Sequence, residues 1–291
     1  MDPERRPVGR SVVGEGGVRL YLEDHGGPDG PAVVLLHGLG FCRLAWARQV
    51  GAAELAGFRL VTVDLRGHGG SDAPPDGYAD PARWAGDLAA VLGGLGLSRP
   101  VLVGWSYGGT VICDYLRHRL AVGDGSPAAP GAVGPAGVVF VGAVSDLGTP
   151  RAVNGLTEEF VAVSRRLVRA VPGDLPAAVG DFVDLCTHRP LPAGERGRMH
   201  GWNSVLPDFV RAGMLRRTLD HDATLRALRA PTLVLHGEAD RVIRPAYGRY
   251  LAGAVPGARL VTVPGAGHMP FWESPERFNA ELAGFAWSVT R

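Results

Sequence analysis

Six short runs of aliphatic residues, many of them β-branched, recur along the chain and constrain its fold more than any other feature. Longer segments with helical spacing separate them, and the runs cover residues 32–36, 59–63, 101–103, 138–141, 232–235 and 259–263. Strands that are apolar throughout, rather than alternately apolar and polar, are typical of a parallel sheet covered on both faces. The pattern therefore predicts an α/β fold, with a mostly parallel sheet and helices on both of its faces.

The alternation of strands and helices stops between Gly148 and Asp222. This stretch has helical spacing instead, and its apolar face consists of Leu156, Phe160, Val163, Leu167 and Val171. We predict that residues 148–222 form a helical lid, inserted into a core built from residues 1–147 and 223–291. A segment rich in Gly, Ala and Pro, residues 123–137, is predicted to be a surface loop.

The third apolar run leads into the sequence Gly104-Trp105-Ser106-Tyr107-Gly108 and then into a helical segment. A G-x-S-x-G pattern between a strand and a helix is typical of a sharp turn that projects its serine above a sheet. The two glycines are needed because this turn leaves no room for side chains beside the serine. The pattern predicts that Ser106 is a nucleophile. The N–H of Tyr107, at the helix N-terminus, is placed to stabilise a developing oxyanion.

A serine is a poor nucleophile at neutral pH, so a base must activate it. His268, in the glycine-containing loop after the last apolar run, is the candidate base. The base needs a carboxylate partner, and Asp240 follows the fifth run, at the sheet edge that also carries the serine turn. Asp146, which follows the fourth run, is the alternative, whereas Glu238 is expected to hold the turn or face solvent. The chain order serine, aspartate, histidine is the expected one, and Asp240 is preferred to Asp146.

A second oxyanion donor is expected in the loop after the first apolar run, where His37-Gly38-Leu39-Gly40 stands. The N–H of Leu39 is the candidate donor. We expect His37 to orient this loop through hydrogen bonds rather than to act as a second base.

The composition narrows the class of partner. Thirty basic and twenty-nine acidic residues give a net charge of +1, which creates no field for nucleic acid or an anionic membrane, so a small molecule is the expected partner. Cys42, Cys113 and Cys186 are odd in number and lack metal-ligand spacing, so reduced core thiols and no metal site are expected. The chain has no apolar leader and no run approaching about 18 apolar residues, which predicts a cytoplasmic protein without membrane contact.

Over almost its whole length the chain resembles the α/β-hydrolase superfamily. The resemblance is carried by the His37-Gly38 loop, the Asp64 to Ser71 turn, the Gly104 to Gly108 turn, the Pro231 to Asp240 strand and turn, and the Gly267-His268 loop followed by Glu273, Ser274 and Pro275. It implies an eight-stranded type of sheet, a Ser106, Asp240, His268 triad, and oxyanion donors at Leu39 and Tyr107. No cofactor is implied. His68, within the Asp64 to Ser71 turn, is expected to be a turn residue rather than a metal ligand.

The activity that the resemblance implies is cleavage of a small carboxylic ester, lactone or thioester through an acyl-enzyme on Ser106. Cofactor-free perhydrolases of the non-haem haloperoxidase type share this triad, although they often have proline where this chain has Gly40. C–C bond hydrolysis, a cyclase or decarboxylase reaction, and a non-catalytic ligand receptor remain alternatives on this fold. Members with an aspartate nucleophile do not fit, because position 106 is serine. The oligomeric state is left open, and the candidates for the pocket wall are Phe41, Trp202, Phe209 and Met269.

Overall fold

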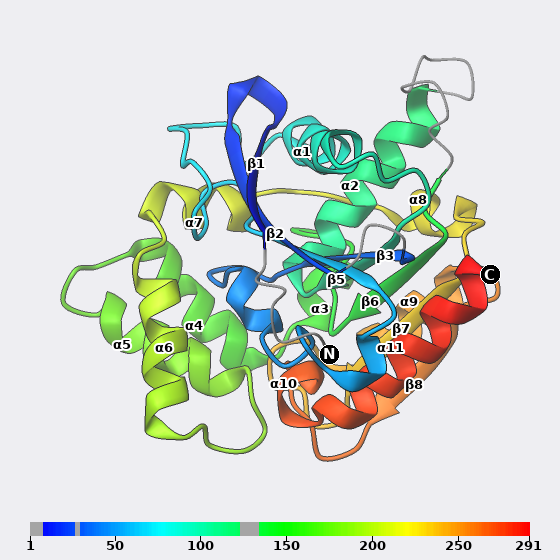
Figure 1. Cartoon of the computed structure of the whole chain (residues 1–291). Coiled ribbons are helices and arrows are strands. Elements are labelled where there is room, and N and C mark those ends of the chain that lie inside the picture. Colours follow the sequence, from blue (N-terminus) through cyan, green and yellow to red (C-terminus); the bar gives the residue numbers. More distant parts are fainter. Residues whose placement is uncertain (1–7, 27–29, 123–133) are drawn as a thin grey trace.

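An eight-stranded sheet runs through the middle of the computed structural model, which describes residues 8–26, 30–122 and 134–291 (Figure 1). The strand order is β1-β2-β4-β3-β5-β6-β7-β8. Strands β3 to β8 pair in parallel, whereas β1 and β2 extend one edge in antiparallel orientation. The strands span β1 Val8–Val13, β2 Arg19–His25, β3 Ala32–Leu36, β4 Arg59–Val63, β5 Val101–Trp105, β6 Gly137–Val141, β7 Thr232–Gly237 and β8 Arg259–Val263.

All six predicted strands are present, and the predicted α/β class is confirmed. The six-run pattern does not predict β1 and β2. In β2, buried Leu20 and Leu22 alternate with more exposed residues, and β1 is exposed along nearly its whole length. A strand near a sheet edge buries one face or neither, so it has no continuous apolar run.

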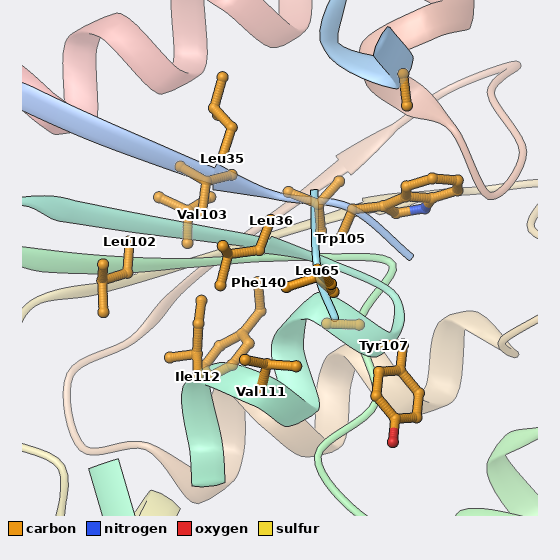
Figure 2. Close-up of a cluster of buried hydrophobic side chains, with 14 of the residues drawn as sticks. Leu35, Leu36, Leu65, Leu102, Val103, Trp105, Tyr107, Val111, Ile112 and Phe140 are labelled. Carbon is orange, nitrogen blue, oxygen red and sulfur yellow. The ribbon is translucent and has the colours of Figure 1, made fainter. Parts of the chain in front are cut away.

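Helices cover both faces of this sheet, with α1 and α2 on one side and α11 on the other (Figure 1). Figure 2 shows apolar side chains of α2, among them Val111 and Ile112, facing those of the central strands. This packing fixes the point at which β5 turns into α2. The helices of the core span α1 Pro81–Gly94, α2 Tyr107–Val122, α8 Asp222–Ala227, α9 Pro245–Ala254, α10 Pro270–Glu273 and α11 Pro275–Thr290, and short 3-10 turns span η1 Glu15–Gly17, η2 Arg43–Trp46 and η3 Ala53–Leu55.

Five further helices lie in the chain between β6 and α8. Helices α4, α5 and α6 gather beside one end of the sheet, on the side of η2 (Figure 1). A bridge between Leu147 and Leu219 joins the two ends of this helical segment, so the chain leaves and re-enters the core at neighbouring points. The five helices span α3 Pro150–Gly155, α4 Glu158–Arg169, α5 Leu175–Leu185, α6 Ala193–Ser204 and α7 Asp208–Leu215.

The predicted apolar face of this segment agrees with α4 at its three middle members only. Leu156 precedes α4, at the end of α3, and forms a bridge with Ile243. Phe160, Val163 and Leu167 are buried, but the side chain of Val171 is 52% exposed. The helix ends before Val171, because Ala170 has a left-handed backbone with φ +48°. The chain therefore turns away, and Val171 does not share the helix face.

The predicted surface loop over residues 123–137 falls mostly on residues 123–133, which lie outside the described residues. Its predicted end is too late, because Gly137 is already the first residue of β6 and is buried. A side chain at Gly137 would bring its Cβ within 2.8 Å of the Phe285 ring on α11, so glycine here reflects close packing rather than a loop.

Candidate active site

The turn between β5 and α2 holds Ser106 in a left-handed backbone conformation, with φ +52°. Such a conformation is strained for a residue other than glycine, and it persists only where the surroundings enforce it. A Cβ at Gly104 would lie 2.6 Å from the backbone carbon of Gly108, and a Cβ at Gly108 would lie 2.5 Å from the carbonyl oxygen of Leu36. The two glycines are therefore required by backbone contact. Ser106 itself remains partly exposed above the sheet.

His268 and Asp240 lie in direct contact. His268 Nδ1 donates a hydrogen bond to Asp240 Oδ2 over 2.9 Å, and both side chains are buried. The other carboxylate oxygen of Asp240 accepts the N–H groups of Val242 at 2.8 Å and Ile243 at 2.9 Å. Because the carboxylate can only accept, the proton of the neutral His268 ring sits on Nδ1, which leaves a lone pair on Nε2.

The ionised form of Asp240 is favoured by its partners. Burial alone would raise the pKa of the Asp240 carboxyl, but its electrostatic interaction with His268 and hydrogen bonds from His236 and His268 hold this pKa well below its usual value. The carboxylate is therefore available to orient the imidazole and to stabilise an imidazolium.

The end of β6 brings the serine turn and this pair together. The carbonyl of Val141 accepts the N–H of Ser106 at 3.0 Å, and the adjacent Gly142 lies against the pair. A Cβ at Gly142 would be 3.2 Å from His268 Nδ1 and 3.3 Å from Asp240 Oδ2. His268 Nε2 is buried and has no hydrogen-bond partner within residues 8–26, 30–122 and 134–291, so the Ser106 to His268 hydrogen bond is not formed. In the absence of substrate such bonds are often long and tighten only in the reacting complex.

The loop after β3 lies against the serine. A Cβ at Gly38 would be 3.0 Å from Ser106 Cβ and 3.5 Å from its Oγ. Within the part of the chain that the structure describes, the N–H groups of Leu39 and Tyr107 donate no hydrogen bond. Two unpaired donors of this kind, from the two segments that flank a serine, are what an oxyanion hole requires.

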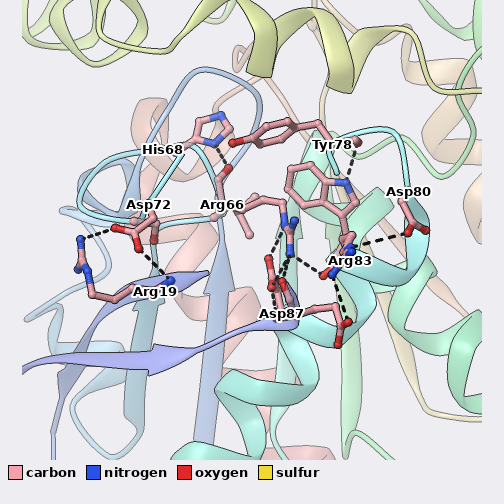
Figure 3. Close-up of polar contacts among 12 residues, drawn as sticks. Arg19, Arg66, His68, Asp72, Tyr78, Asp80, Arg83 and Asp87 are labelled. Carbon is pink, nitrogen blue, oxygen red and sulfur yellow. Dashed lines mark hydrogen bonds and ion pairs between the residues drawn. The ribbon is translucent and has the colours of Figure 1, made fainter. Parts of the chain in front are cut away.

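Two histidines hold the loop after β3, residues 37–42, through hydrogen bonds to the backbone. We call this segment the oxyanion loop. His37 Nδ1 donates to the carbonyl of Gly38 at 2.8 Å, and its Nε2 accepts the N–H of Leu65 at 3.0 Å. His68 Nδ1 donates to the carbonyl of Arg66 at 2.9 Å (Figure 3), and its Nε2 accepts the N–H of Gly40 at 3.3 Å. Both rings must be neutral to accept a bond at one nitrogen and donate at the other. The hydrogen bonds of both rings to described residues all go to backbone groups, as expected for residues that orient a loop.

Burial lowers the pKa of His37 to about 4. Burial, together with the neighbouring His37, lowers the pKa of His68 to about 3. The turn that carries His68 is itself anchored by a buried ion pair, in which Arg66 Nε lies 2.6 Å from Asp87 of α1 (Figure 3). The two histidines that hold this loop therefore stay uncharged near neutral pH, and the turn that carries one of them is fixed by an ion pair.

The rival carboxylates are engaged elsewhere. Asp146 accepts a bond from Arg151 at 2.5 Å, from the N–H of His221 at 2.9 Å and from the Tyr247 hydroxyl at 3.2 Å. Glu238 is exposed. Neither contacts the base, so the geometry favours Asp240 as its partner.

The four residues predicted to line the pocket do not all lie together in the structure. Phe41 is buried, with its ring centroid 4.7 Å from that of Trp105 and 6.4 Å from that of Trp202 of α6. Met269, beside the base, is buried in the core. Phe209 of α7 is instead 47% exposed, and its ring packs 6.0 Å from that of Tyr78. Its placement groups it with the surface near Tyr78 rather than with the aromatic rings next to the serine.

One residue near the triad was not singled out by the sequence. His236 Nε2 donates to the carbonyl of Ile243 at 3.0 Å and lies 3.2 Å from Asp240 Oδ2. Its place four residues before Asp240 is a weak signal, because a strand residue points to either face of a sheet. Only the packing shows that it faces the carboxylate.

Glu273 is a second such residue. It follows the Gly267-His268 loop in the family resemblance, but the sequence alone assigns it no role. Its carboxylate accepts the N–H of Gly267 at 2.6 Å and, from the helical insert, the N–H groups of His188 at 2.7 Å and Arg189 at 3.1 Å. It therefore joins the segment after α5 to the loop between β8 and α10, residues 264–269, which carries His268. We call this second segment the loop of the base. No local pattern could have indicated a contact between positions 85 residues apart.

Across residues 8–26, 30–122 and 134–291, no group of three or more His, Cys, Asp or Glu side chains could hold a metal ion. Cys42, Cys113 and Cys186 are buried free thiols, as predicted. None of the helices in these same ranges is long and apolar enough to cross a membrane.

Comparison with known proteins agrees with this geometry. The family model described as "Alpha/beta hydrolase family" matches residues 33–281. The chain is 35% identical to an esterase, RhEst1, from Rhodococcus sp. ECU1013, and the match covers 97% of this chain and 99% of that one with a TM-score of 0.86. It is 30% identical to the bifunctional esterase/perhydrolase DCH of Acinetobacter calcoaceticus over 94% of this chain and 98% of that one. A non-heme haloperoxidase of Rhodococcus erythropolis is 29% identical, with the same coverage.

The strained serine turn, the buried histidine–aspartate pair and the sheet order thus agree with a family model that spans most of the sequence, and the chain belongs to the α/β-hydrolase family.

Proposed function

We propose that this protein is a serine hydrolase that cleaves a small carboxylic ester, lactone or thioester through an acyl-enzyme on Ser106. The observation that carries the proposal is the buried contact between His268 Nδ1 and Asp240 Oδ2 at 2.9 Å. Because the carboxylate accepts at that position, the lone pair of Nε2 is left free, and Nε2 has no hydrogen-bond partner among the described residues. A free imidazole lone pair next to a strained serine is the arrangement that general-base activation needs.

Ser106 Oγ attacks the substrate carbonyl while His268 Nε2 takes its proton. The N–H groups of Leu39 and Tyr107 stabilise the negative charge of the tetrahedral intermediate, because neither is bound to another acceptor. Collapse of the intermediate expels the alcohol or thiol, which receives the proton from the imidazolium. Water then attacks the acyl carbon while His268 Nε2 takes one of its protons. The bond to Ser106 Oγ breaks, the acid leaves, and the imidazolium returns the proton to Oγ. Asp240 keeps the ring oriented through both halves.

The helical insert supports a substrate of modest size. We propose residues 148–222 as the lid, with the core formed by residues 1–147 and 223–291. Phe41 from the oxyanion loop meets Trp202 of α6 and Phe182 of α5, with ring centroids 6.4 Å and 6.0 Å apart, so aromatic rings of the insert lie close to the oxyanion loop. Phe41, Trp202 and Met269 are the pocket residues that we propose, and the reaction needs no cofactor.

Perhydrolysis is the second candidate activity. It is favoured by the relative named a bifunctional esterase/perhydrolase, which the chain matches along nearly its whole length. In that reaction hydrogen peroxide replaces water in the second half. It attacks the acyl carbon and gives up a proton to His268, the bond to Ser106 Oγ breaks, the peracid leaves, and the imidazolium returns the proton to Oγ.

The test is turnover of p-nitrophenyl esters of increasing acyl length by the wild type and Ser106→Ala. The variant removes one oxygen atom, so it should fold as the wild type does and lose about 10⁴-fold or more of kcat/KM. Ser288→Ala is the matched control, because its hydroxyl only bonds to the carbonyl of Phe285 on α11. Addition of hydrogen peroxide, with peracid measured directly, separates the two activities. Undiminished turnover by Ser106→Ala would contradict the proposal.

A further inference from the structure

The residue before the nucleophile makes a contact that the reaction steps above do not use. Trp105 ends β5 and is 1% exposed. Its indole Nε1 donates a hydrogen bond to the backbone carbonyl of His268 over 2.9 Å, across 163 positions of the sequence. The serine turn and the loop of the base are therefore joined directly, by a buried bond that does not involve either catalytic side chain.

The indole also packs between the other loops of the site. Its centroid lies 5.6 Å from that of His268, and its edge-on neighbours are Phe271 at 5.0 Å and Phe41 at 4.7 Å. A Cβ at Gly38 would be 3.4 Å from the Trp105 ring. One side chain thus contacts the loop of the base, the first turn of α10 and the oxyanion loop.

The two neighbours of the serine are anchored on opposite sides. Figure 2 shows the side chains of Trp105 and Tyr107 pointing away from each other at the end of β5. Trp105 reaches the loop of the base, and the Tyr107 hydroxyl accepts a bond from the buried Arg217 at 2.8 Å. Ser106 is therefore held between two fixed side chains.

We propose that Trp105 is a positioning residue for the base, and that its indole N–H sets the place of His268 relative to Ser106. This inference rests on the proposed function, since it assigns a role within the same site. The Nδ1 bond to Asp240 fixes only one end of the imidazole, and rotation or translation of the backbone at His268 would still move Nε2. The Trp105 bond holds that backbone.

The expected consequence is specific to the chemical step. Without the indole donor, the carbonyl of His268 is left without this partner in a buried loop, and the loop shifts to satisfy it. A displacement of about 1 Å in a catalytic group costs on the order of 10²-fold in rate. Substrate binding does not depend on Nε2, so kcat falls while KM changes little.

The experiment compares Trp105→Phe with Trp46→Phe. Trp46 is also fully buried and packs 4.4 Å from Phe271, but its Nε1 has no hydrogen-bond partner among the described residues. Both changes remove the same atoms, but only Trp105→Phe removes a hydrogen bond to the loop of the base. We expect Trp105→Phe to lower kcat on a p-nitrophenyl ester by about 10- to 100-fold with KM within about twofold, and Trp46→Phe to keep kcat within about threefold.

A second variant removes the donor without changing the shape. Replacement of Trp105 by β-(3-benzothienyl)alanine puts sulfur in place of the N–H and leaves no void in the core, unlike Trp105→Phe. It should give the same fall in kcat. Equal losses in the two tryptophan variants, or a loss confined to KM, would overturn the inference. So would an unchanged kcat in the benzothienyl variant.

A readout without turnover separates this inference from the proposed function. The carbonyl ¹³C resonance of His268 is expected to shift upfield in both Trp105 variants and to stay in place in Trp46→Phe, because only the former remove its hydrogen bond. If the wild type shows no Ser106-dependent turnover, the proposed function fails. If turnover is present but that resonance does not move, the positioning role of Trp105 fails.

Discussion

A buried ion pair beneath the serine turn gives the sharpest prediction for stability. Arg217, between α7 and α8, lies 2.6 Å from Asp114 of α2, and both side chains are 0% exposed. Arg217 also donates to the Tyr107 hydroxyl at 2.8 Å, and His221 Nε2 lies 3.1 Å from the second oxygen of Asp114. The pair therefore links the end of the helical insert to the helix that begins beside Ser106.

The perturbation is Arg217→Met, which keeps most of the aliphatic stem and removes the charge. Breaking a buried pair by removing one partner leaves the other charge without compensation, at a cost of about 3–5 kcal/mol. The matched control is Arg226→Met, because Arg226 is 61% exposed and pairs with Asp222 one helical turn away. An exposed pair of that spacing contributes only about 0.3–0.5 kcal/mol.

Urea unfolding followed by circular dichroism measures both changes, with the slope m checked for constancy. The double variant Arg217→Met/Asp114→Asn removes the orphaned charge as well, so it should recover about 2 kcal/mol relative to Arg217→Met alone. The reasoning is refuted if Arg217→Met costs no more than Arg226→Met. It is also refuted if the double variant loses more unfolding free energy than the two single variants lose together.

Two further predictions concern the oxyanion loop. Because burial lowers the pKa of His37 to about 4 and of His68 to about 3, the unfolded chain binds protons that the folded chain does not. The free energy of unfolding should therefore fall as the pH drops from about 6.5 to about 4, by about 3 kcal/mol for His37 alone. Urea titrations at several pH values measure it, and an unfolding free energy that stayed constant across this range would contradict the prediction. Gly40→Ala should destabilise the fold by about 2–4 kcal/mol and lower kcat, because φ is +75° and the new Cβ would lie 1.8 Å from Asn203 Oδ1 of α6. Addition of Asn203→Ala should restore the steric part, and a double-mutant cycle with no coupling would show that the two side chains do not meet.

Sequence reasoning predicted those features whose causes are local. Five of the six predicted strands lie inside the sheet and are buried along most of their length, and that property is visible in each apolar run by itself. The sixth, β8, is an edge strand and is mostly exposed or half-buried, although its sequence matches that of β4. The edge strand β1 and its neighbour β2 have no continuous apolar run, so the same reasoning missed them. Val171 was assigned to the face of α4 for a related reason, because the periodic pattern continues past Ala170 although the backbone ends the helix there.

The role of an aromatic residue near the site depended on contacts that periodicity cannot show. Phe41 and Phe209 were equivalent as pocket candidates in the sequence. In the structure Phe41 is 1% exposed and faces Trp105, whereas Phe209 is 47% exposed on α7, near Tyr78. The difference arises from how α7 packs on the core, which no local signal records.

The sequence by itself determined the serine turn, because Gly104 and Gly108 are required by contacts between backbone segments only a few residues apart or in the adjoining strand. It also determined which residue types are available for acyl transfer. Only the tertiary structure decided which carboxylate meets His268. Asp146 and Asp240 both follow parallel strands and reach the same sheet edge, so their local sequences are equivalent in this respect. The choice depends on the packing of distant loops, which gives Asp146 to Arg151 and Tyr247 and places Asp240 2.9 Å from the base.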